Sequence, residues 1–178
     1  MAGPGATESS PDRTADEVVA AEAMAGVPLA RSCGQRVLHP SREQLPEVVH
    51  TLREDGWLMC LDVCGVDYLT YDAPRGLPDG IEAERFEVVV TLISHTENDR
   101  VRLRVQVPEG DPTVPSLFEI HPGTEAMERE VFDMFGVRFE GHPDLTRILM
   151  PEDWDGHPLR KDFATGRIPV QFKAPVGR

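Results

Sequence analysis

The feature that most constrains the fold is a pair of alternating segments, Arg85–Ser94 and Arg100–Val107, joined by the short polar loop Thr96–Asp99. A period of two places every second side chain on the same face of a strand. In the second segment the apolar set is Val101, Leu103, Val105 and Val107, and the polar set between them is Arg102, Arg104 and Gln106. The pattern predicts an antiparallel hairpin. Its apolar face must be covered by other elements.

The polar face of this hairpin is basic, although the chain as a whole is acidic. Arg100, Arg102 and Arg104 alternate along the second strand. We expect them to pair across the strands with carboxylates such as Glu84 or Glu87. The alternative is that they face an acidic surface of a partner protein.

Two segments are predicted to be helices that cover the hairpin. The first begins at a capping box, Ser41 with Gln44, and ends at Asp55-Gly56. The second runs from Thr124, its expected N-cap, to Gly136, a residue suited to a left-handed C-cap. Between them, Trp57–Val63 is predicted to be a buried strand. The fold class is therefore α+β, with a mostly antiparallel sheet, helices packed on one face and an extended C-terminal arm.

Composition divides the chain into three parts. Residues 1–28 are rich in Ala, Gly, Pro, Ser and acidic residues, which predicts a flexible N-terminal tail. Residues 29–139 form the α+β domain. Residues 140–178 are polar and rich in Pro and Gly. Because such a segment cannot form its own core, we predict an arm that lies across this domain or a partner.

The second predicted helix carries an unusual carboxylate. At about 100° per residue, Glu128 falls inside the apolar stripe formed by Met127, Val131, Met134 and Phe135, widened by Phe132. Arg129 and Asp133 share the opposite face. A buried charge without a partner is strongly unfavourable. Glu128 therefore reaches solvent, pairs with a local arginine, or has a partner in another segment or subunit.

Charge and hydropathy exclude several classes of protein. The formal net charge of -13 argues against a nucleic-acid-binding protein and against direct adhesion to an anionic membrane. No apolar run approaches the roughly 20 residues of a membrane span. The N-terminus lacks the pattern of a signal peptide, so we expect a cytoplasmic location.

No motif in the sequence identifies a catalytic, cofactor or metal site. There is no Walker loop, dinucleotide fingerprint or nucleophile elbow. His121, His142 and His157 each precede a proline and lack zinc-site spacing. Cys60 and Cys64 form a C-x3-C pair within a predicted strand, where cysteine usually acts as a small apolar residue. An acid–base enzyme using Glu128 or Asp133 with His142 stays as the alternative to a binding protein.

The segment from Glu128 to Gly136, followed by Arg138 to Leu145 and by Arg147-Ile148-Leu149, resembles the signature of the 30-kDa subunit family of respiratory complex I. Bacterial members are the C subunits of NADH-quinone oxidoreductase. The resemblance covers roughly residues 35–165 and departs from the family at Thr146, where a basic residue is usual. The signature and interface residues that it implies are Glu128, Arg129, Glu130, Asp133, Phe135, Gly136, His142, Pro143, Asp144, Arg147, His157, Pro158, Arg160, Lys161 and Asp162.

The resemblance implies a non-redox structural subunit in the hydrophilic arm of a proton-translocating NADH-quinone oxidoreductase. It implies no cofactor in this chain, with FMN, iron–sulfur clusters and quinone held by partner subunits. The expected partners are chiefly the 49-kDa-type quinone-site (D) subunit, and also the cluster-bearing B and I subunits, on which the 140–178 arm would pack. The expected location is the cytoplasmic side of the cell membrane, peripheral and through the complex. A subunit of a related membrane-bound hydrogenase is the alternative.

Overall fold

The computed structural model describes residues 22–164 and 166. The predicted tail up to residue 21, and residues 165 and 167–178 of the predicted arm, lie outside the described part. The elements are β1 (Glu22–Met24), β2 (Val27–Ser32), β3 (Gln35–Leu38), α1 (Leu45–Glu54), β4 (Met59–Asp67), β5 (Phe86–Ser94), β6 (Asp99–Val107), β7 (Thr113–Pro115), the 3-10 helix η1 (Pro122–Thr124), α2 (Glu125–Phe135) and β8 (Arg138–Glu140).

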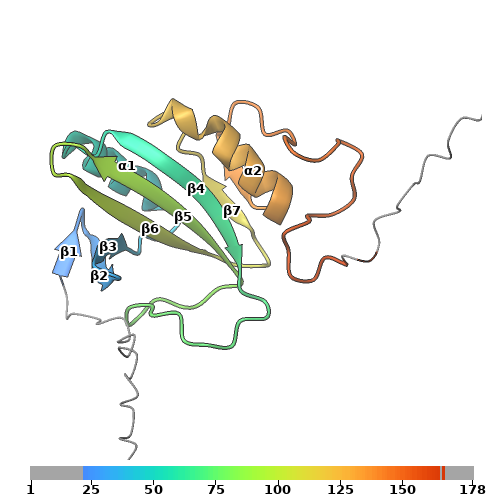
Figure 1. Cartoon of the computed structure of the whole chain (residues 1–178), viewed down its shortest axis with the longest axis horizontal. Coiled ribbons are helices and arrows are strands. Elements are labelled where there is room, and N and C mark those ends of the chain that lie inside the picture. Colours follow the sequence, from blue (N-terminus) through green and yellow to red (C-terminus); the bar gives the residue numbers. More distant parts are fainter. Residues whose placement is uncertain (1–21, 165, 167–178) are drawn as a thin grey trace, which may run out of the picture.

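The main sheet has six strands in the order β1-β2-β3-β6-β5-β4, and β7 pairs with β8 in a small second sheet (Figure 1). The predicted hairpin of β5 and β6 is present and antiparallel. However, β3 pairs with β6 in parallel, as β7 does with β8. The structure thus confirms an α+β fold with two helices, but the sheet is mixed. The parallel pair arises because the chain passes from β3 through α1 to the far edge strand β4, and the hairpin returns beside β3.

The predicted boundary of the N-terminal tail at residue 28 is wrong. Strands β1 and β2 already occupy Glu22–Met24 and Val27–Ser32 and extend the sheet beyond β3. A tight turn joins them, with positive φ angles at Ala25 (50°) and Gly26 (77°). These strands are only three and six residues long, and their sequences lack the apolar alternation that reveals β5 and β6.

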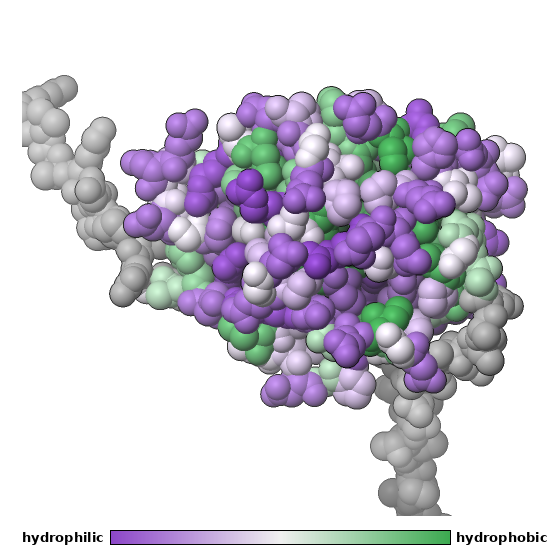
Figure 2. Space-filling model, turned by 180° about the vertical axis from the view of Figure 1, so that it is seen from behind, coloured by the Kyte–Doolittle hydropathy of each residue, from purple (hydrophilic) through white to green (hydrophobic). Residues whose placement is uncertain are grey.

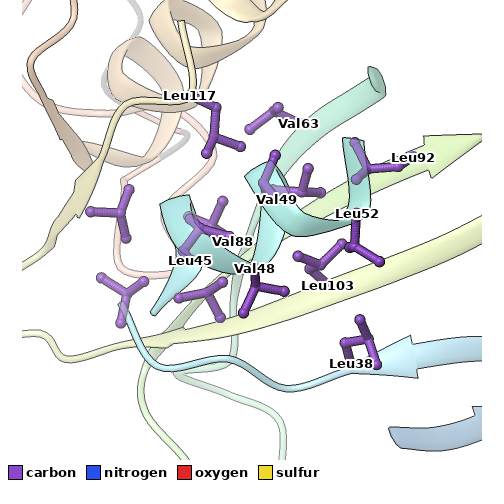
Figure 3. Packing of buried hydrophobic residues seen from close by; sticks show 14 of the residues in the cluster. Leu38, Leu45, Val48, Val49, Leu52, Val63, Val88, Leu92, Leu103 and Leu117 are labelled. Carbon is purple, nitrogen blue, oxygen red and sulfur yellow. The ribbon is translucent and has the colours of Figure 1, made fainter. Parts of the chain in front are cut away.

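The core lies between α1 and the apolar face of the hairpin (Figure 3). The apolar stripe of α1 is buried there, with Val49 and Leu52 fully inaccessible, against Val88 and Leu103 of the sheet. The predicted capping box is confirmed, since the Ser41 N–H donates to Gln44 Oε1 at 3.0 Å and the Gln44 N–H donates to Ser41 Oγ at 3.3 Å. Each buried Val or Leu contributes about 1.5–3 kcal/mol.

The opposite face of the hairpin carries a buried ion pair. The Arg104 guanidinium donates to both carboxylate oxygens of Glu87, at 2.8 and 3.0 Å. Gln106 also donates to this carboxylate, and Glu87 is only 1% exposed. The predicted pairing of the basic strand with a carboxylate is therefore confirmed for Arg104.

A β-bulge in β4 separates the two cysteines of the C-x3-C pair. The register shifts between Cys60 and Asp62, so that Cys60 pairs with Leu92 whereas Cys64 pairs with Val89. Leu92 and Val89 lie on opposite faces of β5, because they are three residues apart. Consequently the two thiols lie on opposite faces of the sheet, and they cannot bind one metal ion together.

Hydrophilic side chains dominate the face shown in Figure 2, with hydrophobic residues scattered in small groups. Within residues 22–164, neither helix has the length and apolar character needed to cross a lipid bilayer.

Candidate functional site

Helix α2 lies beside β4, and the chain after β8 passes around it (Figure 1). We call residues 141–164 the arm, and the contacts between the arm, α2 and the end of β4 the arm junction. Most of the site residues predicted from the sequence lie here. The junction is built on two buried carboxylates, those of Asp133 and Asp67. A third buried carboxylate, that of Glu128, also lies on α2 but contacts the segment before this helix.

Glu128 is fully buried and has its partners in the segment before α2. It accepts hydrogen bonds from Ser116 Oγ at 2.6 Å, the Leu117 N–H at 2.8 Å and Thr124 Oγ1 at 2.9 Å. The prediction that Glu128 lies within the apolar stripe is confirmed, and its partner is in another segment of the same chain. Thr124 does not cap α2 with its side chain, because its hydroxyl is donated to Glu128. Glu128 therefore fixes the segment before α2.

Asp133 is also fully buried, which the sequence did not predict. Its Oδ1 accepts from Arg147 Nη1 at 2.7 Å. Its Oδ2 accepts from three consecutive backbone N–H groups, those of Ile148 (3.1 Å), Leu149 (2.8 Å) and Met150 (2.8 Å). The helical angles place Asp133 on the polar face of α2 with Arg129, and that face is covered by the arm.

The Asp133 contacts favour its ionised form. Burial alone would raise the pKa of Asp133, but the N–H groups of Met150 and Leu149 and the Arg147 guanidinium outweigh it, so the pKa is lowered. The same contacts fix the backbone of the arm at this point. Ile148 and Leu149 keep 40% and 59% of their surface exposed. The carboxylate thus holds two apolar side chains at the protein surface in a defined position.

Arg129 connects α2 to the arm on the same side. Its guanidinium donates to the Thr146 carbonyl and hydroxyl oxygens, both at 3.0 Å, and to the Arg147 carbonyl at 3.1 Å. It also forms an ion pair with Glu125 one turn earlier, at 3.0 Å. Thr146 therefore has a defined role as an acceptor for Arg129.

The arm also satisfies the last carbonyl groups of α2, which have no partner within a helix. The Asp133 carbonyl accepts from His157 Nδ1 at 2.9 Å, the Met134 carbonyl from the Leu159 N–H at 3.0 Å, and the Phe135 carbonyl from Arg160 Nε at 2.5 Å. Since His157 Nδ1 donates here, its tautomer is set by the helix end. Burial and, less strongly, the Arg160 and Arg147 charges lower the pKa of His157, against the effect of this hydrogen bond.

Gly136 makes this approach of the arm possible. It ends α2 in the left-handed conformation, with φ of 73°, and its N–H donates to the Phe132 carbonyl, as predicted for a C-cap. A Cβ at this position would clash with the Arg160 guanidinium and the His157 ring. The position therefore requires glycine both for its backbone and for its packing.

A second contact joins the arm to the end of β4, and the sequence did not reveal it. Asp67 accepts from the Lys161 N–H at 2.8 Å, from the Leu69 N–H at 3.0 Å and from Arg85 at 3.0 Å. Arg85 also contacts Asp162 at 2.9 Å. The segment Gly65-Val66-Asp67-Tyr68 was the available sequence signal for this contact. However, nothing in its local pattern shows that Asp67 contacts Lys161, which lies 94 positions further along the chain.

The remaining predicted site residues are peripheral to the junction or exposed. Glu130, Pro143 and Asp144 are exposed. Both ring nitrogens of His142 are engaged, Nε2 with the Glu125 carbonyl at 3.0 Å and Nδ1 with the Asp144 N–H at 3.1 Å. Phe135 is half-buried against Gly65, Pro158 is half-buried, and Lys161 and Asp162 have exposed side chains.

The junction therefore has little capacity for acid–base chemistry. The carboxylates of Glu128 and Asp133 accept hydrogen bonds from donors of the same chain, and both ring nitrogens of His142 are engaged in hydrogen bonds. Across the described residues, no group of three or more His, Cys, Asp or Glu is arranged to hold a metal ion. The junction is a set of fixed contacts that positions the arm.

Residues 38–168 match the family model described as respiratory-chain NADH dehydrogenase, 30 Kd subunit. The chain is 50% identical over 139 residues to the NADH-quinone oxidoreductase C subunit of Mycobacterium avium (strain 104), covering 76% of this chain and 55% of that protein. It is 42% identical over 170 residues to the protein of the same name from Nocardioides sp. (strain ATCC BAA-499 / JS614), covering 91% and 64%. The chain thus spans little more than half the length of the curated relatives it matches.

Two solved structures share the fold. The trypsin-resistant fragment (1-134) of Nqo5 matches with a TM-score of 0.59 and 36% identity, covering 67% of this chain and 90% of that one. A chain of the membrane-bound sulfane sulfur reductase, an archaeal respiratory membrane complex, matches with a TM-score of 0.62 and 21% identity, covering 81% and 84%. The second likeness concerns the fold alone.

Proposed function

The chain belongs to the 30 Kd subunit family of the respiratory-chain NADH dehydrogenase, and from this we propose that it is a non-redox structural subunit of an NADH-quinone oxidoreductase. The family resemblance found in the sequence is thereby confirmed. The relatives are named as the C subunit of that enzyme. In this role the chain carries no redox step and instead supplies a surface on which another subunit is held.

The observation that carries the proposal is the way Asp133 fixes the arm. Its carboxylate accepts three consecutive backbone N–H groups and the Arg147 guanidinium, which fixes the backbone at Ile148 and Leu149. Two adjacent apolar side chains are left exposed on a segment without helix or strand structure. Surface of this kind, fixed before binding, lowers the entropy lost on association. The arm therefore suits docking on a partner subunit.

The proposed partners are those of a complex I subunit of this family. They are chiefly the 49-kDa-type quinone-site (D) subunit, together with the B and I subunits. FMN, iron–sulfur clusters and quinone would be bound by other subunits. The location proposed is the cytoplasmic side of the cell membrane, peripheral and through the complex. The predicted division into an α+β domain and a partner-binding arm belongs to this proposal, as do the exposed signature residues Glu130, Lys161 and Asp162.

A stand-alone acid–base enzyme is less well supported. Such an enzyme needs a carboxylate or an imidazole with a polar atom that is free to exchange a proton with a substrate. The three residues concerned, Glu128, Asp133 and His142, all have their polar atoms engaged within the chain. The alternative function is that of the equivalent subunit in a complex I-related hydrogenase. The proteins that co-purify with the chain would distinguish this alternative from the proposal.

The test replaces the exposed apolar pair without disturbing the core. In the double variant Ile148→Asp and Leu149→Asp, the backbone hydrogen bonds to Asp133 can persist, while the docking surface becomes charged. We expect the variant to fold but to lose co-purification with the 49-kDa-type subunit and to lose NADH:quinone activity in membranes. The control places two aspartates on the exposed β5–β6 hairpin loop, at His95 and Thr96. Normal assembly of the arm variant would contradict the proposal.

A further inference from the structure

A cavity of about 480 Å³ lies away from the arm, between the connection from β3 to α1 and the loop that precedes β5. His39, Ser41 and Gln106 contribute to its wall, and Asp79, Glu82 and Glu84 come from the loop. Apart from Arg42, the ionisable groups of its lining are of two kinds. One buried imidazole lies on the sheet side, and a group of carboxylates lies on more exposed residues.

His39 is the buried group. It follows Leu38, which pairs with Leu103, and so it lies beside Arg104 on the polar face of the sheet. Only 4% of its surface is exposed. Neither ring nitrogen has a hydrogen-bond partner in the part of the chain that the structure describes. Buried polar atoms normally have partners, so this ring lacks one donor and one acceptor.

The ring is neutral at physiological pH. Burial, and secondarily the positive charge of Arg104, lower the pKa of His39 to about 4, and Glu87 opposes this only in part. A neutral imidazole has one N–H donor and one nitrogen that accepts a hydrogen bond. The cavity can therefore offer an acceptor to a cationic donor without repelling it.

The more exposed part of the cavity lining is negatively charged. Glu43, Asp79, Glu82 and Glu84 contribute to the lining, and no ion pair involves them within the described residues. The one basic residue in the lining, Arg42, is already paired with Asp111 at 2.8 Å. An anionic ligand is therefore disfavoured. No set of three metal-ligating side chains is assembled at this place or elsewhere in the described residues, which disfavours a metal ion.

We propose that this cavity is a binding site for an arginine side chain presented by a loop of another protein. A guanidinium carries five N–H donors in one plane, enough for the His39 acceptor nitrogen and for two or more carboxylates at once. The cavity is large for the compact ammonium group of lysine, whose three donors would leave more of the lining unpaired. The backbone carbonyl of the bound loop supplies the acceptor for the His39 N–H.

This site is independent of the assignment to a respiratory enzyme, because it lies apart from the arm junction and is tested on the isolated chain. The probe is N-acetyl-arginine methylamide, and its neutral isostere N-acetyl-citrulline methylamide is the reference. Binding to the isotopically labelled 178-residue chain is followed by NMR at the His39 ring and at the Gly80 and Ile81 amides. We expect saturable shifts confined to these groups, with the citrulline probe bound about tenfold more weakly or not at all.

The charge dependence is measured with matched variants. Glu82→Gln with Glu84→Gln should weaken arginine binding about tenfold. The control, Glu54→Gln with Glu97→Gln, changes the net charge equally at exposed positions outside the cavity and should leave the affinity unchanged. Equal weakening by both pairs, or equal binding of the citrulline probe, would overturn the proposal. Equal binding of N-acetyl-lysine methylamide would overturn the choice of arginine.

A second readout does not depend on the carboxylates. His39→Phe removes the acceptor nitrogen and fills part of the cavity. We expect it to abolish the shifts of the Gly80 and Ile81 amides on addition of the arginine probe. If this variant does not fold, His39→Ala removes the imidazole without adding bulk and should weaken arginine binding about tenfold. Unchanged arginine binding in a folded His39→Phe protein would show that the imidazole takes no part.

Discussion

The core and the arm junction of this protein are held together by different forces. Between α1 and the hairpin, apolar side chains such as Leu52 and Leu103 are fully buried against one another. In the arm junction, the buried groups are the carboxylates of Asp133 and Asp67, which accept hydrogen bonds from the arm backbone. Apolar burial is non-directional, whereas hydrogen bonds require a defined geometry. The core therefore provides stability, and the junction provides the position of one segment.

The largest expected effect comes from the core. Leu103→Ala removes a fully buried side chain from the sheet and leaves a cavity under α1. We expect a loss of about 2–5 kcal/mol in the free energy of unfolding. Chemical denaturation followed by circular dichroism measures it. Leu58→Ala, at a leucine with 65% exposure, is the control and should change stability by less than about 0.5 kcal/mol.

Removal of the Asp133 contacts tests whether the arm can lose its structure while the core stays folded. Asp133→Asn removes the charge and turns part of the acceptor into a donor that faces the Ile148, Leu149 and Met150 N–H groups. We expect a loss of about 1–3 kcal/mol, with fast hydrogen exchange at these three amides and little change at Val88 and Leu103. Accelerated exchange of equal size in the hairpin would mean that the arm and the core unfold together, and the comparison would fail.

The end of α2 gives a smaller effect. Gly136→Ala forces a side chain into a backbone conformation with φ of 73° and into contact with His157 and Arg160. The backbone strain is about 1–2 kcal/mol, and the clash displaces the arm. Limited proteolysis should cut between residues 141 and 164 faster than in the unsubstituted chain. Gly110→Ala, where a Cβ meets nothing within 4 Å, is the matched change.

The smallest expected effect is a dependence of the free energy of unfolding on pH, caused by His39 on the sheet. The pKa of His39 is lowered to about 4 in the folded chain, below about 6.5 in an unfolded one. The unfolded state thus binds more protons between these values, and stability falls as the pH falls through about 6.5. Between pH 7 and 6, His39 should account for less than about 1 kcal/mol. Urea denaturation of His39→Gln should show a correspondingly flatter dependence, and an identical slope would argue against a buried neutral ring.

Local patterns predicted those parts whose partners lie close in sequence. The hairpin, the α1 capping box and the position of Glu128 within the apolar stripe all follow from a period of two or of 3.6, or from a three-residue spacing. The position of Asp133 could not be predicted in this way. Its angle on the helix indicates a polar face, but what covers that face is decided by Arg147 and the three following N–H groups. The parallel pairing of β3 with β6 depends on the whole path of the chain.

The acceptors that the arm uses at the end of α2 do not exist until that helix has formed. The carbonyls of Asp133, Met134 and Phe135 point towards His157, Leu159 and Arg160 only because the last turn ends at Gly136. During folding the arm should therefore dock after the helix, late in the reaction and beyond the rate-limiting barrier. Substitutions in the arm should then speed unfolding while leaving the folding rate nearly unchanged. The order in which this surface assembles is thus set by the end of a single helix.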